Sequence, residues 1–246
     1  MRGRRSDGLY NLRTPDNSHF PAWCDMSGPN GGWLVFQRRI NASVNFTRGW
    51  ASYEKGFGRH GFEFWLGNLY IHRITRRGDH MLRIEKSVSI HGRDRTFFAE
   101  HDSFRMSSSF DNYNLHVGKY RGNLGEILSD ANNSAFSTWD RDNDKVNGSC
   151  ALTNEGAWWY GRTCDIQDLN SMLGNVTKLS LVKITMKTKK ALRGNTLSYC
   201  LILFCFVLFF HFYLINGGGS LKSQSIFVGL VHTDLAVCMT HEQHSC

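Results

Sequence analysis

The chain has 246 residues, of which 41% are hydrophobic and 13% aromatic, enough to bury the core of one large domain or two small ones. This composition excludes a mostly disordered chain. The formal net charge is +8, but Lys and Arg are scattered and form no stripe or motif typical of nucleic-acid recognition. We therefore expect no nucleic-acid partner.

Residues 1–178 are rich in aromatic residues and glycine. Short alternating runs within them predict strands of a twisted, mainly antiparallel sheet, at Trp33–Arg39, Met81–Glu85, Thr96–Ala99 and Tyr113–Val117. Trp50–Gly58 and Leu66–Ile74 each predict a short helix that ends near a glycine. The stretch 121–178 is polar and loop-rich. The predicted fold class is therefore α+β with a large irregular lobe.

An acidic loop at residues 140–150 carries carboxylates at every second position from Asp140 to Asp144. Calcium takes about six to eight oxygen ligands, and a short loop can supply them from alternating carboxylates and backbone carbonyls. The loop begins like an EF-hand, but Lys145 replaces the required glycine and Ala151 the final glutamate, so we exclude an EF-hand. The spacing alone is equally compatible with an ion-binding site and with a solvated acidic turn that binds no ion.

The cysteines and sequons indicate an oxidising compartment. Cys150 and Cys164 lack the C-x-x-C spacing of zinc sites, so a disulfide is the favoured interpretation. Closing a loop of about 15 residues would add roughly 3 kcal/mol of stability. Five N-x-[S/T] sequons predict glycosylation, at Asn41, Asn45, Asn132, Asn147 and Asn175.

The two ends of the chain differ from a typical secreted domain. The N-terminus has no apolar segment of a signal peptide, so secretion would require a start further upstream. Residues 191–246 form an atypical tail in which 199–215 are almost entirely apolar, and as a helix this run would span about 25 Å. We interpret the tail first as a read-through or mis-spliced end. A membrane anchor with a basic flank or a buried helix is the alternative.

No pattern in the sequence indicates catalysis. The histidines are scattered, and neither G-x-S-x-G nor H-E-x-x-H occurs. We therefore expect that the protein is not an enzyme.

Several motifs occur in a fixed order along the first two thirds of the sequence: Cys24–Met26, Gly31–Arg39, Gly61–Asn68 followed by Ile71-His72, Phe136–Asp144, Cys150-Ala151 and Gly156–Tyr160. Together they resemble the fibrinogen C-terminal (fibrinogen-related) domain of the fibrinogens, ficolins, tachylectins, angiopoietins and tenascins. The resemblance implies an α+β fold with a twisted antiparallel sheet, short helices and a loop-rich calcium-binding lobe. It assigns residues 1–178 to an incomplete domain of this family, with 179–190 similar to its last strand.

In this family the aspartate loop binds one calcium ion. By position, the resemblance implies side-chain ligands from Asp142 and Asp144 and backbone carbonyl ligands from Val146 and Gly148. Asp140 would be a water-mediated partner. The resemblance also implies a Cys150–Cys164 disulfide beside the loop.

Many members of the family recognise acetyl groups or sialic acid in a pocket next to the calcium. Here the resemblance implies a pocket formed by Trp159, Tyr160, Cys164 and Asp165, although the Trp-Trp pair also suits plain core packing. The implied function is extracellular, calcium-dependent, lectin-like binding of acetylated glycans or glycoproteins, as in ficolin-like innate immunity. The alternatives are a fibrinogen-like module that binds protein partners and no sugar, or a non-functional truncated variant. An upstream region would be the place for oligomerisation.

The sequence also departs from the family pattern. Cys24 has no obvious partner, and the usual Cys-His pair is Cys164-Asp165. The downstream Gly-Val-Asn-Trp and Trp-Lys-Gly block is absent between Asn175 and the segment 179–187. These departures place the pocket, rather than the acidic loop, in question.

Overall fold

The computed structural model describes residues 6–14, 17–27, 31–90, 93–165, 168–171 and 180–189. The tail 191–246, with its apolar run 199–215, lies outside the described residues. Within the described ranges, no helix has the length and apolar character needed to cross a membrane.

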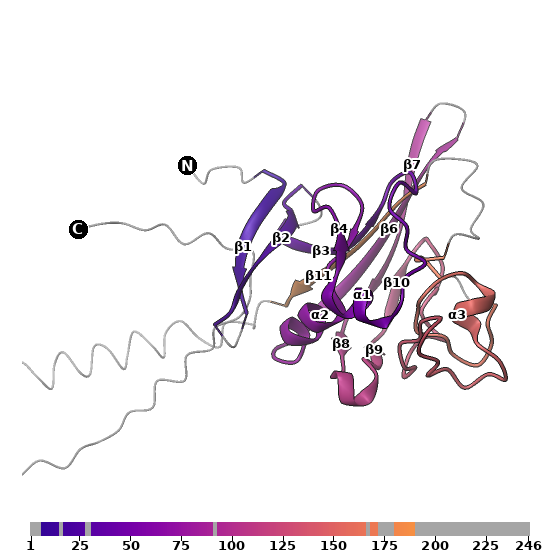
Figure 1. Cartoon of the computed structure of the whole chain (residues 1–246). Coiled ribbons are helices and arrows are strands. Elements are labelled where there is room, and N and C mark those ends of the chain that lie inside the picture. The colour runs from indigo at the N-terminus through magenta and orange to yellow at the C-terminus, as the bar shows by residue number, and fades with distance from the viewer. Residues whose placement is uncertain are drawn as a thin grey trace, which may run out of the picture. The chain divides into compact units, whose positions relative to one another are not determined.

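A large antiparallel sheet organises the domain (Figure 1). Its strands are β1 (Gly8–Arg13), β2 (His19–Asp25), β3 (Trp33–Arg39), β4 (Phe57–Gly58), β5 (Phe64–Trp65), β6 (His80–Ile90), β7 (Arg93–His101), β10 (Tyr120–Gly122) and β11 (Ser180–Thr188). They follow the order β1-β2-β3-β11-β6-β7-β10, and β5 pairs with both β3 and β4. A separate hairpin joins β8 (Phe104–Met106) and β9 (Leu115–Val117). The predicted α+β class with a mainly antiparallel sheet is confirmed.

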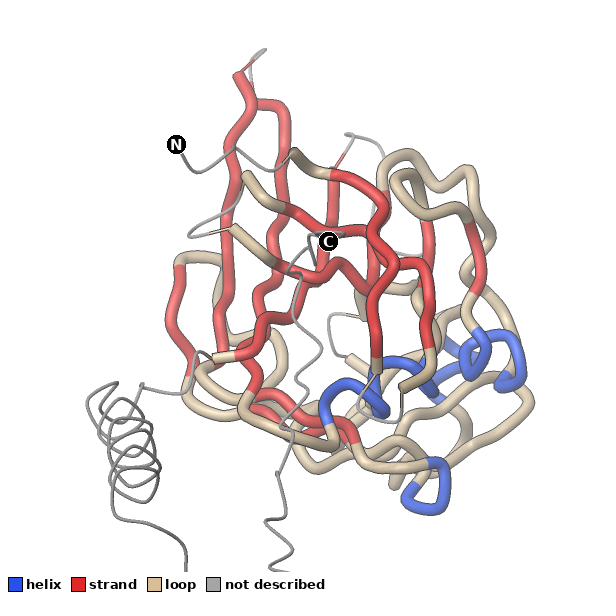
Figure 2. The backbone as a smooth tube through the Cα atoms, turned by 90° about the vertical axis from the view of Figure 1, so that its left-hand side faces the viewer, coloured by secondary structure: helices blue, strands red, loops and turns tan. Residues whose placement is uncertain are grey.

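The helices are short: α1 (Trp50–Lys55), α2 (Asn68–Thr75), α3 (Cys150–Thr153) and the 3-10 turn Ser109–Asp111. In the tube view, the strands run side by side, and the helices lie to one side of them among long loops (Figure 2). The helix α1 ends at Gly56, whose φ of 90° favours glycine and whose Cβ would collide with the Leu66 carbonyl oxygen.

Several predicted elements have different bounds in the structure. β6 and β7 are longer than the predicted runs Met81–Glu85 and Thr96–Ala99, and Phe57–Gly58, predicted as the end of a helix, form β4. The run Tyr113–Val117 becomes a strand only from Leu115, because Tyr113 has a φ of 51°, which a strand does not allow. The helix α2 begins at Asn68, and its C-terminal cap is Arg76 in helical conformation rather than a glycine.

The strand that resembles the family's last strand lies inside the sheet. β11 pairs with β3 on one side, from Val182↔Arg39 to Met186↔Leu34, and with β6 on the other, from Ser180↔Val88 to Thr188↔His80. A strand hydrogen-bonded on both sides connects the two halves of the sheet. The compact domain therefore extends to Thr188.

An aromatic cluster joins the helices to the loop-rich lobe. The rings of Tyr53 and Trp65 lie 5.5 Å apart, and those of Phe136 and Trp159 lie 5.1 Å apart. The ring centroids of Trp65 and Phe136 lie 6.1 Å apart, and all four side chains are buried. Because each ring buries a large apolar area, this cluster holds the lobe rigidly against α1 and β5.

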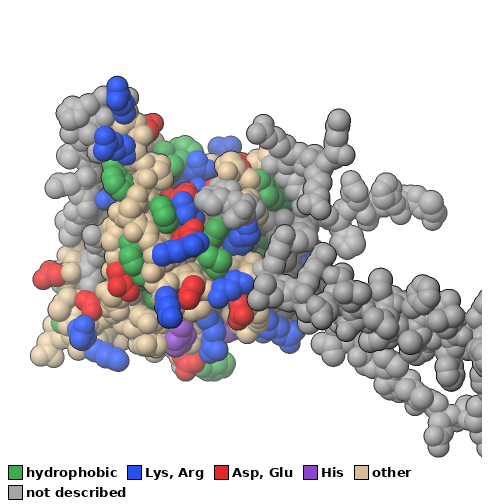
Figure 3. Space-filling view, turned by 180° about the vertical axis from the view of Figure 1, so that it is seen from behind, with side chains coloured by type: hydrophobic (Ala, Val, Ile, Leu, Met, Phe, Trp, Pro, Cys, Tyr) green, Lys and Arg blue, Asp and Glu red, His purple; other side chains and the backbone are tan. Residues whose placement is uncertain are grey.

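Paired charges cross β6, β7, β10 and β11. Arg83 contacts both Glu85 (2.7 Å) and Glu100 (2.5 Å), Lys183 contacts Glu85 (2.5 Å), and Arg121 contacts Glu100 (2.5 Å). Seen from behind, Lys or Arg and Asp or Glu side chains alternate over the domain (Figure 3). The cations in this row are therefore balanced by neighbouring acids.

Candidate functional site

The acidic loop is attached to the first helix by Asp140. Its Oδ1 accepts hydrogen bonds from the backbone N–H of Trp50 (2.8 Å) and the hydroxyl of Thr138 (2.7 Å). A Cβ at Gly49 would collide with this carboxylate, so glycine gives the aspartate room to reach the start of α1. Asp140 thus anchors the loop, and its water-mediated contact with calcium stays a prediction.

The next two aspartates shape the loop itself. Asp142 Oδ1 accepts from the N–H of Asp144 (3.2 Å). Asp144 accepts from the N–H of Val146 (2.9 Å) through one oxygen and from the N–H of Cys150 (3.0 Å) through the other. Each carboxylate therefore turns the backbone back on itself, and Gly148 completes the turn with a φ of 91°.

The Asp142 and Asp144 carboxyl groups lie close together. Burial and the neighbouring Asp144 charge raise the pKa of Asp142, although the Asp144 N–H acts in the opposite direction. A neighbouring negative charge disfavours ionisation of Asp142, and a divalent cation bound beside Asp142 would reverse that effect.

Asn143, which lies between the two aspartates in the sequence, holds them in position. Its backbone N–H donates to the Ser137 hydroxyl (3.0 Å), and its side-chain amide donates to the Phe136 carbonyl (2.8 Å). Ser137 and Phe136 are fully buried, and the N–H of Ser137 donates to the Trp158 carbonyl. The only signal in the sequence was the asparagine between two aspartates.

The donor set fits calcium better than a transition metal. Among the described residues, no three His, Cys, Asp or Glu side chains gather in a way that could hold a metal ion. A cation at Asp142 and Asp144 would depend on carboxylate, backbone carbonyl and water oxygens, which is the chemistry that calcium prefers. The residues that would hold it are the two aspartates with Val146 and Gly148.

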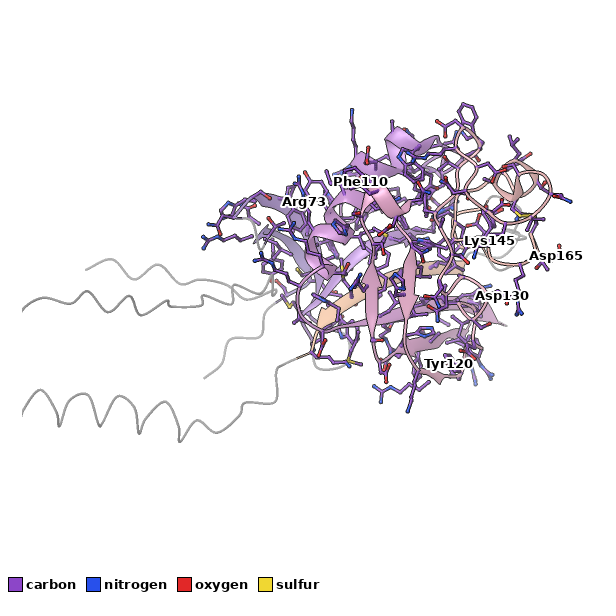
Figure 4. All side chains as sticks on the ribbon, turned by 90° about the horizontal axis from the view of Figure 1, so that it is seen from below. Arg73, Phe110, Tyr120, Asp130, Lys145 and Asp165 are labelled. Atoms are coloured by element: carbon purple, nitrogen blue, oxygen red, sulfur yellow. A yellow bond between two sulfur atoms is a disulfide. The ribbon has the colours of Figure 1, made fainter. Side chains whose placement is uncertain are left out.

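A disulfide closes the lobe beside the loop. Cys150 and Cys164 are bonded with a Cα–Cα distance of 5.0 Å. Figure 4 shows Lys145 of the acidic loop and Asp165, the residue that follows Cys164 in the sequence, on the same side of the domain. Cys24, for which the sequence offered no partner, is buried and also disulfide-bonded.

Replacing both Cys150 and Cys164 with serine should lower the free energy of unfolding by about 3 kcal/mol, because the bond closes a loop with a sequence separation of 14. Urea titration of the variant and of the parent, both without reductant, measures the difference. A loss below about 1 kcal/mol would mean that the unfolded state is already compact around this loop.

The four predicted pocket residues differ in their solvent exposure. Trp159 and Tyr160 are buried; the Trp159 indole donates to the Tyr113 carbonyl (2.7 Å), and the Tyr160 hydroxyl donates to Asp168 (2.6 Å). Cys164 is half-buried and Asp165 is exposed. The pocket itself stays a prediction.

A separate cavity of about 220 Å³ lies between β2, β4, β5 and α2. Its walls include Phe20, Phe57 and Tyr70, with Lys55 and His60 beside them. It shares no residue with the predicted pocket.

The predicted glycosylation sites differ in accessibility. Asn41 and Asn45 are exposed, and each side-chain oxygen accepts from the N–H two residues later, in Ser43 and Thr47. Asn132 is half-buried and its side-chain oxygen accepts from the N–H of Val117 (3.0 Å). The first two positions leave more room for a glycan on the folded domain.

A family model described as "Fibrinogen beta and gamma chains, C-terminal globular domain" matches residues 1–190. The protein therefore belongs to the fibrinogen C-terminal domain family.

Relatives within the family include Ryncolin-4 of Cerberus rynchops, with 44% identity over 70% of this chain and 49% of that protein. Human Ficolin-3 is 42% identical over 68% of this chain and 55% of its own length. Mouse angiopoietin-related protein 6 is 41% identical over 69% of this chain and 36% of its own length. The chain thus spans about half the length of the first two relatives and less of the third.

Solved structures agree with the fold. The fibrinogen-like globe domain of human ANGPTL6 covers 76% of this chain and 91% of its own, with a TM-score of 0.66 and 32% identity. Lamprey fibrin D-dimer, in complex with the peptide Gly-His-Arg-Pro-amide, covers 80% of this chain and 74% of its own, with a TM-score of 0.63 and 25% identity.

Proposed function

We propose that the protein is an extracellular, non-catalytic recognition module that binds acetylated glycans with the help of calcium. The observation that carries this proposal is the acidic loop, in which Asp142 and Asp144 face one another on a backbone held by Asn143. Bound calcium would supply positive charge and draw the oxygen ligands of the loop together. The loop supplies two carboxylates and the carbonyls of Val146 and Gly148.

The loop can pass this rigidity to neighbouring segments. Asp144 is tied to Cys150, which continues through its disulfide to Cys164, and Asp140 is tied to α1 at Trp50. A ligand surface beside the loop would therefore be ordered when the two carboxylates are neutralised.

Two features support an extracellular location. The Cys150–Cys164 disulfide requires an oxidising compartment to persist. The sequon residues Asn41, Asn45 and Asn147 are all exposed, as an attached glycan requires.

Calcium should raise the melting temperature of the parent protein and allow its retention on N-acetylated beads, with elution by free N-acetylated sugar. At a calcium concentration about 100 times the Kd, the stabilisation should be about 2.7 kcal/mol. Asp142→Ala should abolish both effects, because it removes one of the two side-chain ligands. Differential scanning calorimetry and the bead assay, each with calcium or chelator, measure them.

Asp111→Ala is the matched control, because Asp111 is an exposed aspartate outside the acidic loop. Retention of Asp142→Ala equal to that of the parent would contradict the proposed mechanism. A calcium-dependent rise in melting temperature without retention on any acetylated bead would keep the metal site and reject the sugar.

That second outcome would favour a protein or peptide ligand. The ANGPTL6 domain resembles this protein at 32% identity, and the lamprey fibrin structure contains a bound peptide. A peptide-binding module is therefore the second candidate function, and peptide-array binding by the calcium-loaded protein would test it.

A further inference from the structure

Among the described residues, the β6–β7 hairpin extends past its neighbours in the sheet. The two strands pair continuously from Leu82↔His101 to Ile90↔Arg93. On the outer side of β7, β10 pairs only with residues 99–101, and on the side of β6, β11 begins at the level of Val88. The tip of the hairpin therefore projects from the domain (Figures 1 and 2).

Cationic and apolar side chains share one face of this hairpin. Because side chains alternate along a strand, the cross-strand pairs Lys86↔Phe97 and Val88↔Arg95 lie on the same face, and Arg93, two residues before Arg95, joins them. We define these five residues as the hairpin face.

Near the tip, beyond Phe98, the opposite face of the hairpin is polar. There the hydroxyls of Ser87 and Thr96 lie 2.7 Å apart in a hydrogen bond, and Ser89 pairs with Asp94. The acidic side chain of Asp94 therefore points away from the three cations.

The three cations also lack the compensation found elsewhere in the sheet. Arg83, Arg121 and Lys183 all have glutamate partners, whereas no ion pair involves Lys86, Arg93 or Arg95 in the part of the protein that the structure describes. Arg93 and Arg95 are exposed, and Lys86 is partly exposed. Lys and Arg side chains are visible at the hairpin tip, at the upper left of Figure 3.

Charges on a free edge strand also prevent pairing with other proteins. Charges of either sign, on either face of the hairpin, would serve that role. It therefore does not explain why the cations lie on the same face as Val88 and Phe97 while Asp94 lies on the opposite face. A surface that is both anionic and apolar at its boundary explains the arrangement, since the cations would meet charged headgroups and the two apolar side chains would rest beside the acyl boundary.

We propose that the hairpin face is a docking surface for anionic phospholipid bilayers. Each Lys or Arg near such a surface adds about 1 kcal/mol, or about a fivefold preference, so the three together should favour anionic over neutral bilayers by about 100-fold. The attraction should weaken with added salt.

The test compares sedimentation of the full-length protein with vesicles of phosphatidylcholine alone and vesicles that also contain phosphatidylserine. A chelator excludes calcium bridging, so a failure here leaves the proposed calcium function unaffected. The readout is the ratio of binding to the two kinds of vesicle, in which any contribution from the apolar run 199–215 cancels. The triple variant Lys86→Gln, Arg93→Gln, Arg95→Gln should lose about 100-fold in this ratio.

The control variant Arg59→Gln, Arg105→Gln, Lys119→Gln has the same net charge and changes exposed cations elsewhere. It should keep the parent ratio, and both triple variants should keep the parent melting temperature. An equal loss of the vesicle-binding ratio in both triple variants would show a general charge effect and overturn the proposal. Retention on heparin beads without binding to anionic vesicles would also overturn it and indicate a sulfated glycan instead.

Discussion

Glu63→Gln should lower the free energy of unfolding by about 4 kcal/mol at neutral pH. The Glu63 side chain is fully buried, and its two oxygens accept five hydrogen bonds from the segment that follows β3. The donors are the N–H groups of Ile40, Asn41, Ala42 and Val44 and the hydroxyl of Ser43, at 2.6–2.9 Å. A glutamine has one acceptor oxygen, so its NH₂ group would face N–H donors that then lack partners.

The effect should depend on pH. Burial alone would raise the pKa of Glu63, but the backbone N–H groups and the Ser43 hydroxyl outweigh it and lower the pKa from 4.5 to about 2. This lowering corresponds to about 3 kcal/mol of stability, which is present above pH 4.5 and lost as the pH falls towards 2. The unpaired donors account for the remaining ~1 kcal/mol.

Urea titrations of the parent and Glu63→Gln at neutral pH and near pH 2 measure this difference. The difference in the free energy of unfolding between the two proteins should narrow to about 1 kcal/mol near pH 2. Glu126→Gln is the control, because Glu126 is exposed and its replacement should change stability by less than about 0.5 kcal/mol. A gap that does not vary with pH would show that packing, not ionisation, makes Glu63 important.

Asp168→Asn should stabilise the domain above pH 7, by at most about 4 kcal/mol. Burial raises the pKa of Asp168 to about 7, against the lowering effect of the Tyr160 hydroxyl, the N–H groups of Asn170 and Ser171, and Arg39. The folded state therefore keeps a proton that the unfolded state has released, so stability falls as the pH rises from about 4 to 7. The partial exposure of the residue makes 4 kcal/mol an upper value.

Asparagine can replace the protonated acid without ionising. Its oxygen can accept from the N–H of Asn170, as Asp168 does at 2.7 Å, and its NH₂ can donate to the Tyr160 hydroxyl. Thermal unfolding between pH 4 and 8 should therefore give a flatter profile for Asp168→Asn than for the parent. The exposed Asp165→Asn should keep the parent profile, and a parent profile that rises from pH 4 to 7 would refute the argument.

Local pattern was enough for the elements that depend on near neighbours. Trp33–Arg39 has the bounds of β3, and the helix predicted from Trp50 ends at Gly56 because glycine alone fits the backbone there. The ordered motifs were specific enough to indicate the family, which the match to residues 1–190 confirms. Calcium, the acetylated ligand and the pocket at Trp159 and Tyr160 stay predictions.

Residues distant in sequence decided the rest. That Asp140 would reach Trp50, that Gln37 would donate to the Leu169 carbonyl, and that Ser180–Thr188 would enter the middle of the sheet all depend on which segments meet in space. Periodicity reports which face of a segment is apolar, but not which segment covers that face. By itself the sequence determined the family, the fold class and the acidic loop with its carboxylates. Only the tertiary structure decided what holds that loop in place, because its anchors come from α1, the Ser137–Trp158 bridge and the Cys150–Cys164 bond.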